Sequence, residues 1–309
     1  MRHRVQWTAF AGLLLVVILG RDAKAQVSYS VIDSIYTQNF DTLPNTPENA
    51  SLGASPLGWI DDNSSPNVGN FSILGWYLYH PVTQSEGGAN NHQRMRAGSG
   101  TSSTGAFYSY GESGSTERAL ASTGSTTMAS ASQSMYMAMR LVNNTSETIS
   151  GFELTYDGEQ WRVGGTETGN DKLLFAYSLT ADVNNWNTAS GFTAVPSLTF
   201  TPPVTGVAAA AVDGNGIGRV SDIHGATAGF SWLPGTELWL RWADLGGAGA
   251  VNNGLGIDNI RFTAGNNIVD PTLITSVMSG TSSTPATWSN NLPPDAANRY
   301  HVLSGHTVT

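Results

Sequence analysis

The sequence contains no cysteine and little positive charge. None of its 309 residues is a cysteine, and lysine plus arginine total 14 against 23 acidic residues. Without cysteine, the chain forms no disulfide, iron–sulfur cluster, thiol nucleophile or cysteine-ligated metal site. A formal net charge of −9 with no basic cluster also makes nucleic acids and anionic membranes poor partners.

Long apolar runs are also scarce, and the one that exists lies at the start of the chain. Arg2 and Arg4 precede the apolar run from Ala9 to Leu19, and a small-x-small site at Ala23 to Ala25 follows it. This order is typical of a secretory signal peptide, here the first 25 residues. A membrane anchor needs about 20 apolar residues, so we expect no membrane span in the mature chain.

The mature chain is therefore expected to be secreted or held at the cell surface. Removing residues 1–25 takes away four basic residues and one acidic residue, so the net charge of −9 becomes −12. Lys172 is then the only lysine. A chain of this size can bury enough apolar surface to fold outside the cell without disulfides.

Signatures of common enzyme classes are missing too. The sequence has no Gly-x-Ser-x-Gly elbow, no His-Glu-x-x-His pair, no phosphate-binding loop and no dinucleotide fingerprint. The glycine-rich segment Gly214 to Gly218 breaks the fingerprint spacing and predicts a plain turn. These absences favour a protein that is not an enzyme.

What the sequence does contain is period-two alternation, clearest near its end. Thr236 to Asp244 and Gly254 to Thr263 alternate large apolar residues with polar ones, which predicts two strands that each bury one face. The Gly/Asn-rich segment 245–253 is too short for a connecting helix. The two strands are therefore antiparallel neighbours or cross from one sheet to another.

About ten short strands separated by turn signals predict an all-β fold, an antiparallel two-sheet β-sandwich of the jelly-roll type. No convincing amphipathic helix is present. Residues 81–104 and 113–132 are expected to be mostly loop, and Asp157-Gly158 is expected to be a turn. The predicted strands before the closing pair are 27–32, 35–40, 71–79, 106–111, 134–142, 148–156, 159–163, 172–179 and 192–200.

The chain divides near residue 264. Residues 26–264 are predicted to form the β-sandwich, and residues 265–309 a linker with a short partial β segment. The last alternating segment, Tyr300 to Val308, cannot bury a face alone. We expect a repeat region to continue beyond Thr309.

Four motifs connect this sequence to a known group of proteins: Asn39 to Pro44, Glu159 to Arg162, Leu238 to Trp242 and Gly256 to Ile260. Over residues 36–263 the chain resembles secreted bacterial jelly-roll, concanavalin-like β-sandwich domains. Such domains lie at the N-terminal side of large exported surface proteins, here followed by what resembles the start of an extracellular β-strand repeat. The resemblance implies a fold and an extracellular setting, and it leaves the activity open.

Two functions remain in competition. The first is an exported, non-enzymatic module, structural or adhesive, that binds glycans or other cell-surface polymers. Exposed aromatic rings would stack on sugars, with Trp59, Trp76, Tyr77 and Trp186 as candidates, although large aromatics in a sandwich are usually core. The second is a secreted, glycosidase-like hydrolase whose carboxylate pair includes Glu159, with no second acid named.

No cofactor is expected, with calcium as the one open alternative. Asp213, Asn215 and Asp157 offer hard oxygen ligands, but none belongs to a complete calcium loop. Ordinary Asx turns explain these residues more simply.

Asp258 is the acid on which the sequence makes its sharpest prediction. On a regular strand it shares a face with Ile260 and Phe262, so it is expected to point inward. A buried carboxylate needs a cation or several donors. We expect Asp258 to pair with Arg241, or failing that with Arg162, and the alternative makes Asp258 a calcium ligand.

Overall fold

The computed structural model describes residues 26–46, 48–49, 73–80, 95–124, 134–166, 171–188, 190–244, 252–268, 273–276, 278–288, 299–302 and 306–309. The signal peptide and Trp59 lie outside these ranges, so their roles stay predictions. Within the ranges, no helix has the length and apolar character needed to cross a membrane.

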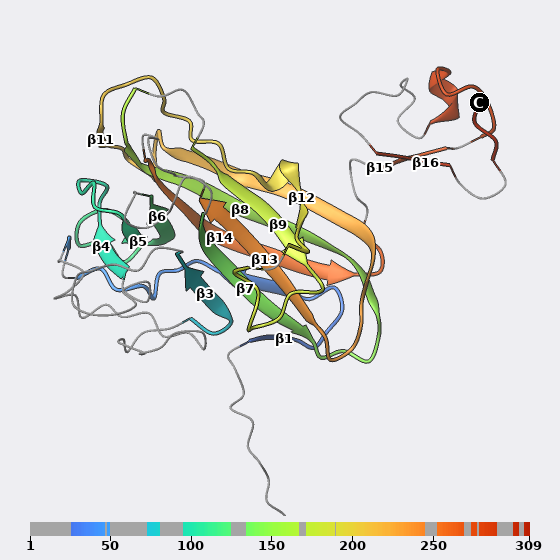
Figure 1. Cartoon of the computed structure of the whole chain (residues 1–309), viewed down its shortest axis with the longest axis horizontal. Helices are drawn as coiled ribbons and strands as arrows, with labels where there is room; N and C mark the ends of the chain where they lie inside the picture. Colours follow the sequence, from blue (N-terminus) through green and yellow to red (C-terminus); the bar gives the residue numbers. More distant parts are fainter. Residues whose placement is uncertain are drawn as a thin grey trace, which may run out of the picture.

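The described chain is an all-β sandwich, which confirms the predicted fold class (Figure 1). One sheet, called sheet A here, has the order β1-β7-β13-β9-β10, and β3 also pairs with β7. The β1–β7 pair is parallel and the other pairs are antiparallel. The strands of sheet A are β1 (Val27–Tyr29), β3 (Trp76–Tyr79), β7 (Met135–Asn143), β9 (Leu173–Ser178), β10 (Thr193–Ala194) and β13 (Glu237–Asp244).

The second sheet, sheet B, has the order β11-β8-β14-β6-β5-β4, with β12 also on β8 and β2 also on β14. Only its β4–β5 pair is parallel. The long strands of both sheets lie over one another in Figure 1. The strands of sheet B are β2 (Ile35–Gln38), β4 (Met95–Gly98), β5 (Ala106–Tyr110), β6 (Ala119–Thr123), β8 (Ile149–Val163), β11 (Ala210–Ala211), β12 (Arg219–Trp232) and β14 (Gly254–Gly265).

The closing pair of strands crosses between the sheets. β13 lies at the centre of sheet A, and β14 at the centre of sheet B. Their alternating apolar residues meet in one core, where each fully buried large apolar side chain contributes about 1.5–3 kcal/mol. The inward residues of the two strands are Leu238, Leu240, Trp242, Leu255, Ile257, Ile260 and Phe262.

The predicted turn at Asp157-Gly158 is wrong, because β8 runs through it without a break. A Cβ atom on Gly158 would lie 2.3 Å from Cδ2 of Phe200. The glycine therefore leaves room for the Phe200 ring to pack against the strand. Glycine inside a strand often marks such a close approach.

The strands β4, β6 and β12 were not predicted from sequence. β4 and β6 each have one large apolar residue, Met95 and Leu120, among small or polar ones, and all are buried on both faces, so neither strand shows alternation. β12 carries Gly225 and Gly229 and has mostly exposed or half-buried residues. Neither pattern is the half-buried alternation from which the other strands could be predicted.

The C-terminal segment forms its own small sheet. β15 (Leu273–Thr275) and β16 (Arg299–His301) pair only with each other, and Figure 1 shows them apart from the sandwich. The sandwich continues slightly past the predicted boundary: β14 ends at Gly265, and the Asn266 side chain accepts a 2.9 Å hydrogen bond from Ser150 N.

Candidate functional site

A β-bulge in β14 decides which way Asp258 points. The pairing of β14 with β8 shifts register between Asp258 and Arg261, and Asn259 has a positive φ of 51°. Ile257 and Ile260 both enter the core across this bulge. Asp258 therefore lies on the outer face of sheet B, and its predicted place beside Ile260 in the core is corrected.

On that outer face Asp258 meets two further acids. Glu159 comes from β8 and Glu117 lies two residues before β6, and both strands are direct neighbours of β14. One carboxylate oxygen from each residue lies within 4.8 Å of the other two. Glu159 and Asp258 are 0% and 2% exposed, and Glu117 is half-buried. We call Glu117, Glu159 and Asp258 the carboxylate cluster.

The cluster is short of hydrogen-bond donors. Trp161 shares a face with Glu159, as the strand pattern predicts, and its Nε1 donates to Glu159 Oε2 over 2.7 Å. Within the described chain, Glu159 Oε1 and Asp258 Oδ1 are buried without a hydrogen-bond partner. Burial raises the pKa of Glu159 to about 8, and nearby Glu117 adds to this rise. Burial, and then Glu159, raise the pKa of Asp258 to about 8.

The structure does not pair Asp258 with either arginine proposed from sequence. Arg241 lies in sheet A, where its Nη1 donates to the Trp186 carbonyl over 2.9 Å and its guanidinium lies 3.5 Å from the Phe192 ring centroid. Arg162 donates to the Gly100 carbonyl over 3.1 Å. The bulge at Asn259 turns Asp258 outward, away from the other sheet, so the expected contact does not form.

Three of the four aromatic candidates are packing residues. Trp76 lies in the core between the sheets. Tyr77 and Trp186 are fully buried in a second cluster with Trp239, outside sheet A. None of the three presents a ring face to solvent, because each removes a large apolar area from water by packing. A sugar-stacking role for Trp76, Tyr77 and Trp186 is therefore corrected.

Asp213 and Asn215 behave as the turn interpretation predicts, whereas Asp157, the third weak metal candidate, lies within β8 and forms no turn. Asp213 Oδ1 accepts from the backbone N–H groups of Asn215 and Gly216, both over 3.0 Å, which is an Asx turn. Asn215 Nδ2 donates to Glu117 Oε2 over 2.5 Å. This turn thus helps to hold the carboxylate cluster, a role that no sequence pattern around Glu117 indicates.

Asp157 belongs to an open polar pocket next to the cluster. It forms an ion pair with Arg219, accepts 2.9 Å hydrogen bonds from Asn259 Nδ2 and Asp222 N, and is buried. The pocket has a volume of about 550 Å³ and opens between β2, β8, β12 and β14. We call it the polar pocket, and its polar lining residues are Thr37, Gln38, Asn39, Asp157, Arg219, Asn259 and Arg261.

Strained backbone collects around the polar pocket. Phe40, Asp222 and Asn259 have φ values of 54°, 55° and 51°. Asn259 lines the pocket, Phe40 follows its lining residue Asn39, and Asp222 binds Asp157 at its edge. Positive φ is costly for a non-glycine residue, above all for a bulky one such as Phe40, and such strain is concentrated at functional sites.

Comparison with known proteins gives similar structures but no family. No protein-family model matches the chain, and no curated protein does. The K3 cleaved adhesin domain of Lys-gingipain from Porphyromonas gingivalis is similar at 11% identity and a TM-score of 0.33, over 61% of this chain and 91% of that one.

Two other solved structures are similar to a comparable degree. A carbohydrate-binding module solved with β-1,4-galactotriose has 9% identity and a TM-score of 0.26, over 48% of this chain and 72% of that one. The enzymatically active domain of tailspike protein 4 from bacteriophage CBA120 has 11% identity and a TM-score of 0.29, over 68% of this chain and 22% of that one. Likeness at this level decides nothing about ligand or activity.

Proposed function

We propose that this chain is an exported, non-catalytic adhesive module that binds glycans in the polar pocket. The observation that supports the proposal is the pocket itself, an open hollow of about 550 Å³ on the outer face of the sandwich. Export rests on the predicted signal peptide, which also sets the extracellular location of the ligand.

The chemistry of the pocket lining matches sugar hydroxyl groups. Carboxylate, amide and guanidinium groups are planar and have at least two hydrogen-bonding atoms, so each can engage two neighbouring hydroxyls at once. Asp157 already holds Arg219 and Asn259 in fixed positions through its own hydrogen bonds. Such prior ordering lowers the entropy lost on binding.

The burial of the acids weighs against the hydrolase alternative. A glycosidase needs two carboxyl groups about 5–10 Å apart that face a cleft open to the substrate. Glu159 and Asp258 are 0% and 2% exposed, and they belong to a cluster whose oxygens lie within 4.8 Å of one another. A glycosidic bond has no route between them.

Binding of the purified protein to a glycan array tests the proposal. Arg261 is exposed, lines the pocket and has no side-chain hydrogen bond within the described residues, so Arg261→Ala removes donors without disturbing the fold. For any glycan that the wild-type protein binds, we expect the variant to lose at least tenfold in affinity, which is about 1.4 kcal/mol. Lys172→Ala removes one positive charge away from the pocket and should bind like the wild type.

Two results would contradict this function. One is an array on which the protein binds no glycan. The other is release of reducing sugar from a retained glycan in an activity that Glu159→Gln abolishes, since this would make the carboxylate cluster catalytic.

A further inference from the structure

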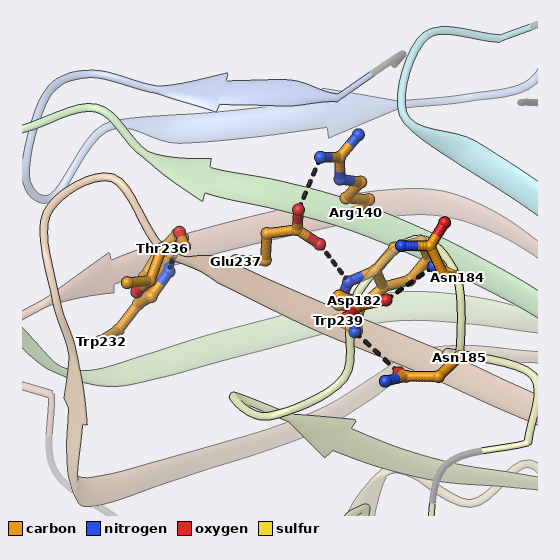
Figure 2. Close-up of polar contacts among 8 residues, drawn as sticks. All are labelled: Arg140, Asp182, Asn184, Asn185, Trp232, Thr236, Glu237 and Trp239. Carbon is orange, nitrogen blue, oxygen red and sulfur yellow. Dashed lines mark hydrogen bonds and ion pairs between the residues drawn. The ribbon is translucent and has the colours of Figure 1, made fainter. Parts of the chain in front are cut away.

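The sequence pattern Glu-x-Trp occurs in both sheets, but the glutamate has different hydrogen-bond partners in the two copies. In sheet A, Trp239 Nε1 donates to Glu237 Oε2 over 2.7 Å, and the other oxygen of Glu237 accepts from Arg140 over 2.6 Å (Figure 2). In sheet B, Trp161 makes the same 2.7 Å bond to Glu159. The other oxygen of Glu159 has no hydrogen-bond partner in the described chain, although Glu159 is fully buried.

Two other acids, Asp258 and Glu117, lie close to Glu159. Asp258 Oδ1 is also buried without a hydrogen-bond partner among the described residues. Glu117 contributes a third carboxylate, and one carboxylate oxygen from each of the three residues lies within 4.8 Å of the other two. Two oxygens bound to the same calcium ion can be at most about 4.6–5.2 Å apart, because each Ca–O distance is about 2.3–2.6 Å. The spacing of the cluster is therefore the spacing of calcium ligands.

Two of the acids are also held as metal ligands usually are. Asn215 donates to Glu117 Oε2 over 2.5 Å, and Trp161 donates to Glu159 Oε2. Donors that bind one carboxylate oxygen orient the other, and such outer contacts are typical of built metal sites. For Glu159 this leaves Oε1, which has no hydrogen-bond partner in the described chain.

The arginines near the cluster are bound to other groups. Arg118 is buried, and it donates to the Ser109 hydroxyl over 2.9 Å and to the Ser109 carbonyl. Arg219 forms its ion pair with Asp157. Three neighbouring carboxylates with so little neutralisation must take up protons or a cation.

We propose that Glu117, Glu159 and Asp258 bind one calcium ion, which links β6, β8 and β14 on the outer face of sheet B. A set of carboxylate oxygens favours a hard cation, and calcium accepts a less regular arrangement than the strict octahedron of magnesium. Glu117 is half-buried, so it gives the ion a path from solvent. The proposal is independent of glycan binding.

Calcium dependence of thermal unfolding tests the proposal in the full purified chain. A ligand that binds only the folded state raises its melting temperature. We expect calcium added to chelator-treated protein to raise the Tm by several degrees. Terbium should bind the same site and luminesce on tryptophan excitation, because Trp161 contacts Glu159 directly, and calcium should displace it.

Matched variants locate the site. Glu159→Gln and Asp258→Asn should each remove most of the calcium-induced shift. Glu153→Gln makes the same change on the same strand, at an exposed residue that contacts His224 over 2.9 Å, and should keep the full shift. If either cluster variant fails to fold, terbium binding to the wild type still decides.

Equal melting temperatures in chelator and in calcium, with no terbium luminescence, would overturn the proposal. The acids would then hold protons instead. A full calcium shift in both folded cluster variants would overturn it as well.

Discussion

A single backbone angle at Asn259 decides where Asp258 lies. At this position β14 has one residue more than its partner β8, and Asn259 adopts a positive φ of 51°. Ile257 and Ile260 therefore both reach the core while Asp258 points outward. Strand periodicity correctly predicts that Glu159 and Trp161 share a face. It cannot predict Asp258, because nothing in the alternation of β14 shows where a bulge interrupts it. The expected contact with Arg241 also fails because Arg241 lies between Leu240 and Trp242, which enter the core, and therefore points away from sheet B.

Substitution of Asn259 tests this role of the backbone. Asn259→Val should destabilise the fold by about 1–3 kcal/mol, because a β-branched residue is strained at positive φ. Asn259→Gly removes the strain but loses the 2.9 Å bond to Asp157, so it should cost less than about 1 kcal/mol. Urea unfolding of both variants gives the comparison. Equal costs would mean that the bulge does not restrict the side chain.

The buried acids predict an unusual pH dependence in chelator. Burial raises the pKa of both Glu159 and Asp258 to about 8, above their ordinary values of 4.5 and 3.8. The folded state therefore keeps protons that the unfolded state releases, and stability falls as pH rises from about 4 to about 8. We expect the Tm in chelator to drop by several degrees over this range.

The double variant Glu159→Gln and Asp258→Asn is the control for that measurement, because it should flatten the profile. A wild-type Tm that rises steadily across the same range would contradict the raised pKa values of the pair. The other charges that act on them, Glu117, Asp41, Asp157 and Arg219, remain in both proteins.

At the scale of elements, the sequence predicts the strands that have one apolar face and misses those that do not. β7 and β13 alternate clearly, so both could be predicted within a few residues. β6, Ala-Leu-Ala-Ser-Thr, has a single large apolar residue and is buried on both faces, so its sequence predicts a loop. Because Glu117 lies just before β6, missing this strand also meant missing the third member of the carboxylate cluster.

The loop after β4 packs directly on β8, and two glycines form a matched test of that contact. Gly100 and Gly114 have φ values of 80° and 79°. A Cβ on Gly100 would lie 1.7 Å from the Trp161 carbonyl oxygen, whereas one on Gly114 would have no atom within 4 Å. Alanine at Gly114 should cost about 1–2 kcal/mol, the strain of positive φ alone.

Alanine at Gly100 should cost more than about 3 kcal/mol, because the loop must also move off β8. The difference between the two variants in chemical denaturation measures the contact of the loop with the strand. Similar losses of stability would show that the loop does not rest on β8.

At the scale of the whole molecule, the sandwich and the C-terminal segment are expected to behave as separate units. β15 and β16 pair only with each other, and an isolated two-stranded sheet is marginal in water. We expect limited proteolysis to remove the segment after residue 268 first. The remaining fragment should melt within about 2 °C of the full chain, since a loss of 1 kcal/mol would shift it by about 2–4 °C.

This boundary is slightly later than the one that the sequence predicts at residue 264, because Asn266 still contacts β8 through Ser150. A protease that degrades the sandwich while the C-terminal segment stays intact would contradict the division into these two units.

Both proposals concern the outer face of sheet B: calcium binding by the buried carboxylate cluster, and glycan binding in the polar pocket. Titration calorimetry of the purified protein with the glycan best retained on the array tests the binding claim most directly. We predict one site per chain, an affinity reduced at least tenfold by Arg261→Ala, and wild-type binding by Lys172→Ala. No heat of binding from any retained glycan, or equal affinity in the wild type and Arg261→Ala, would contradict the proposed function.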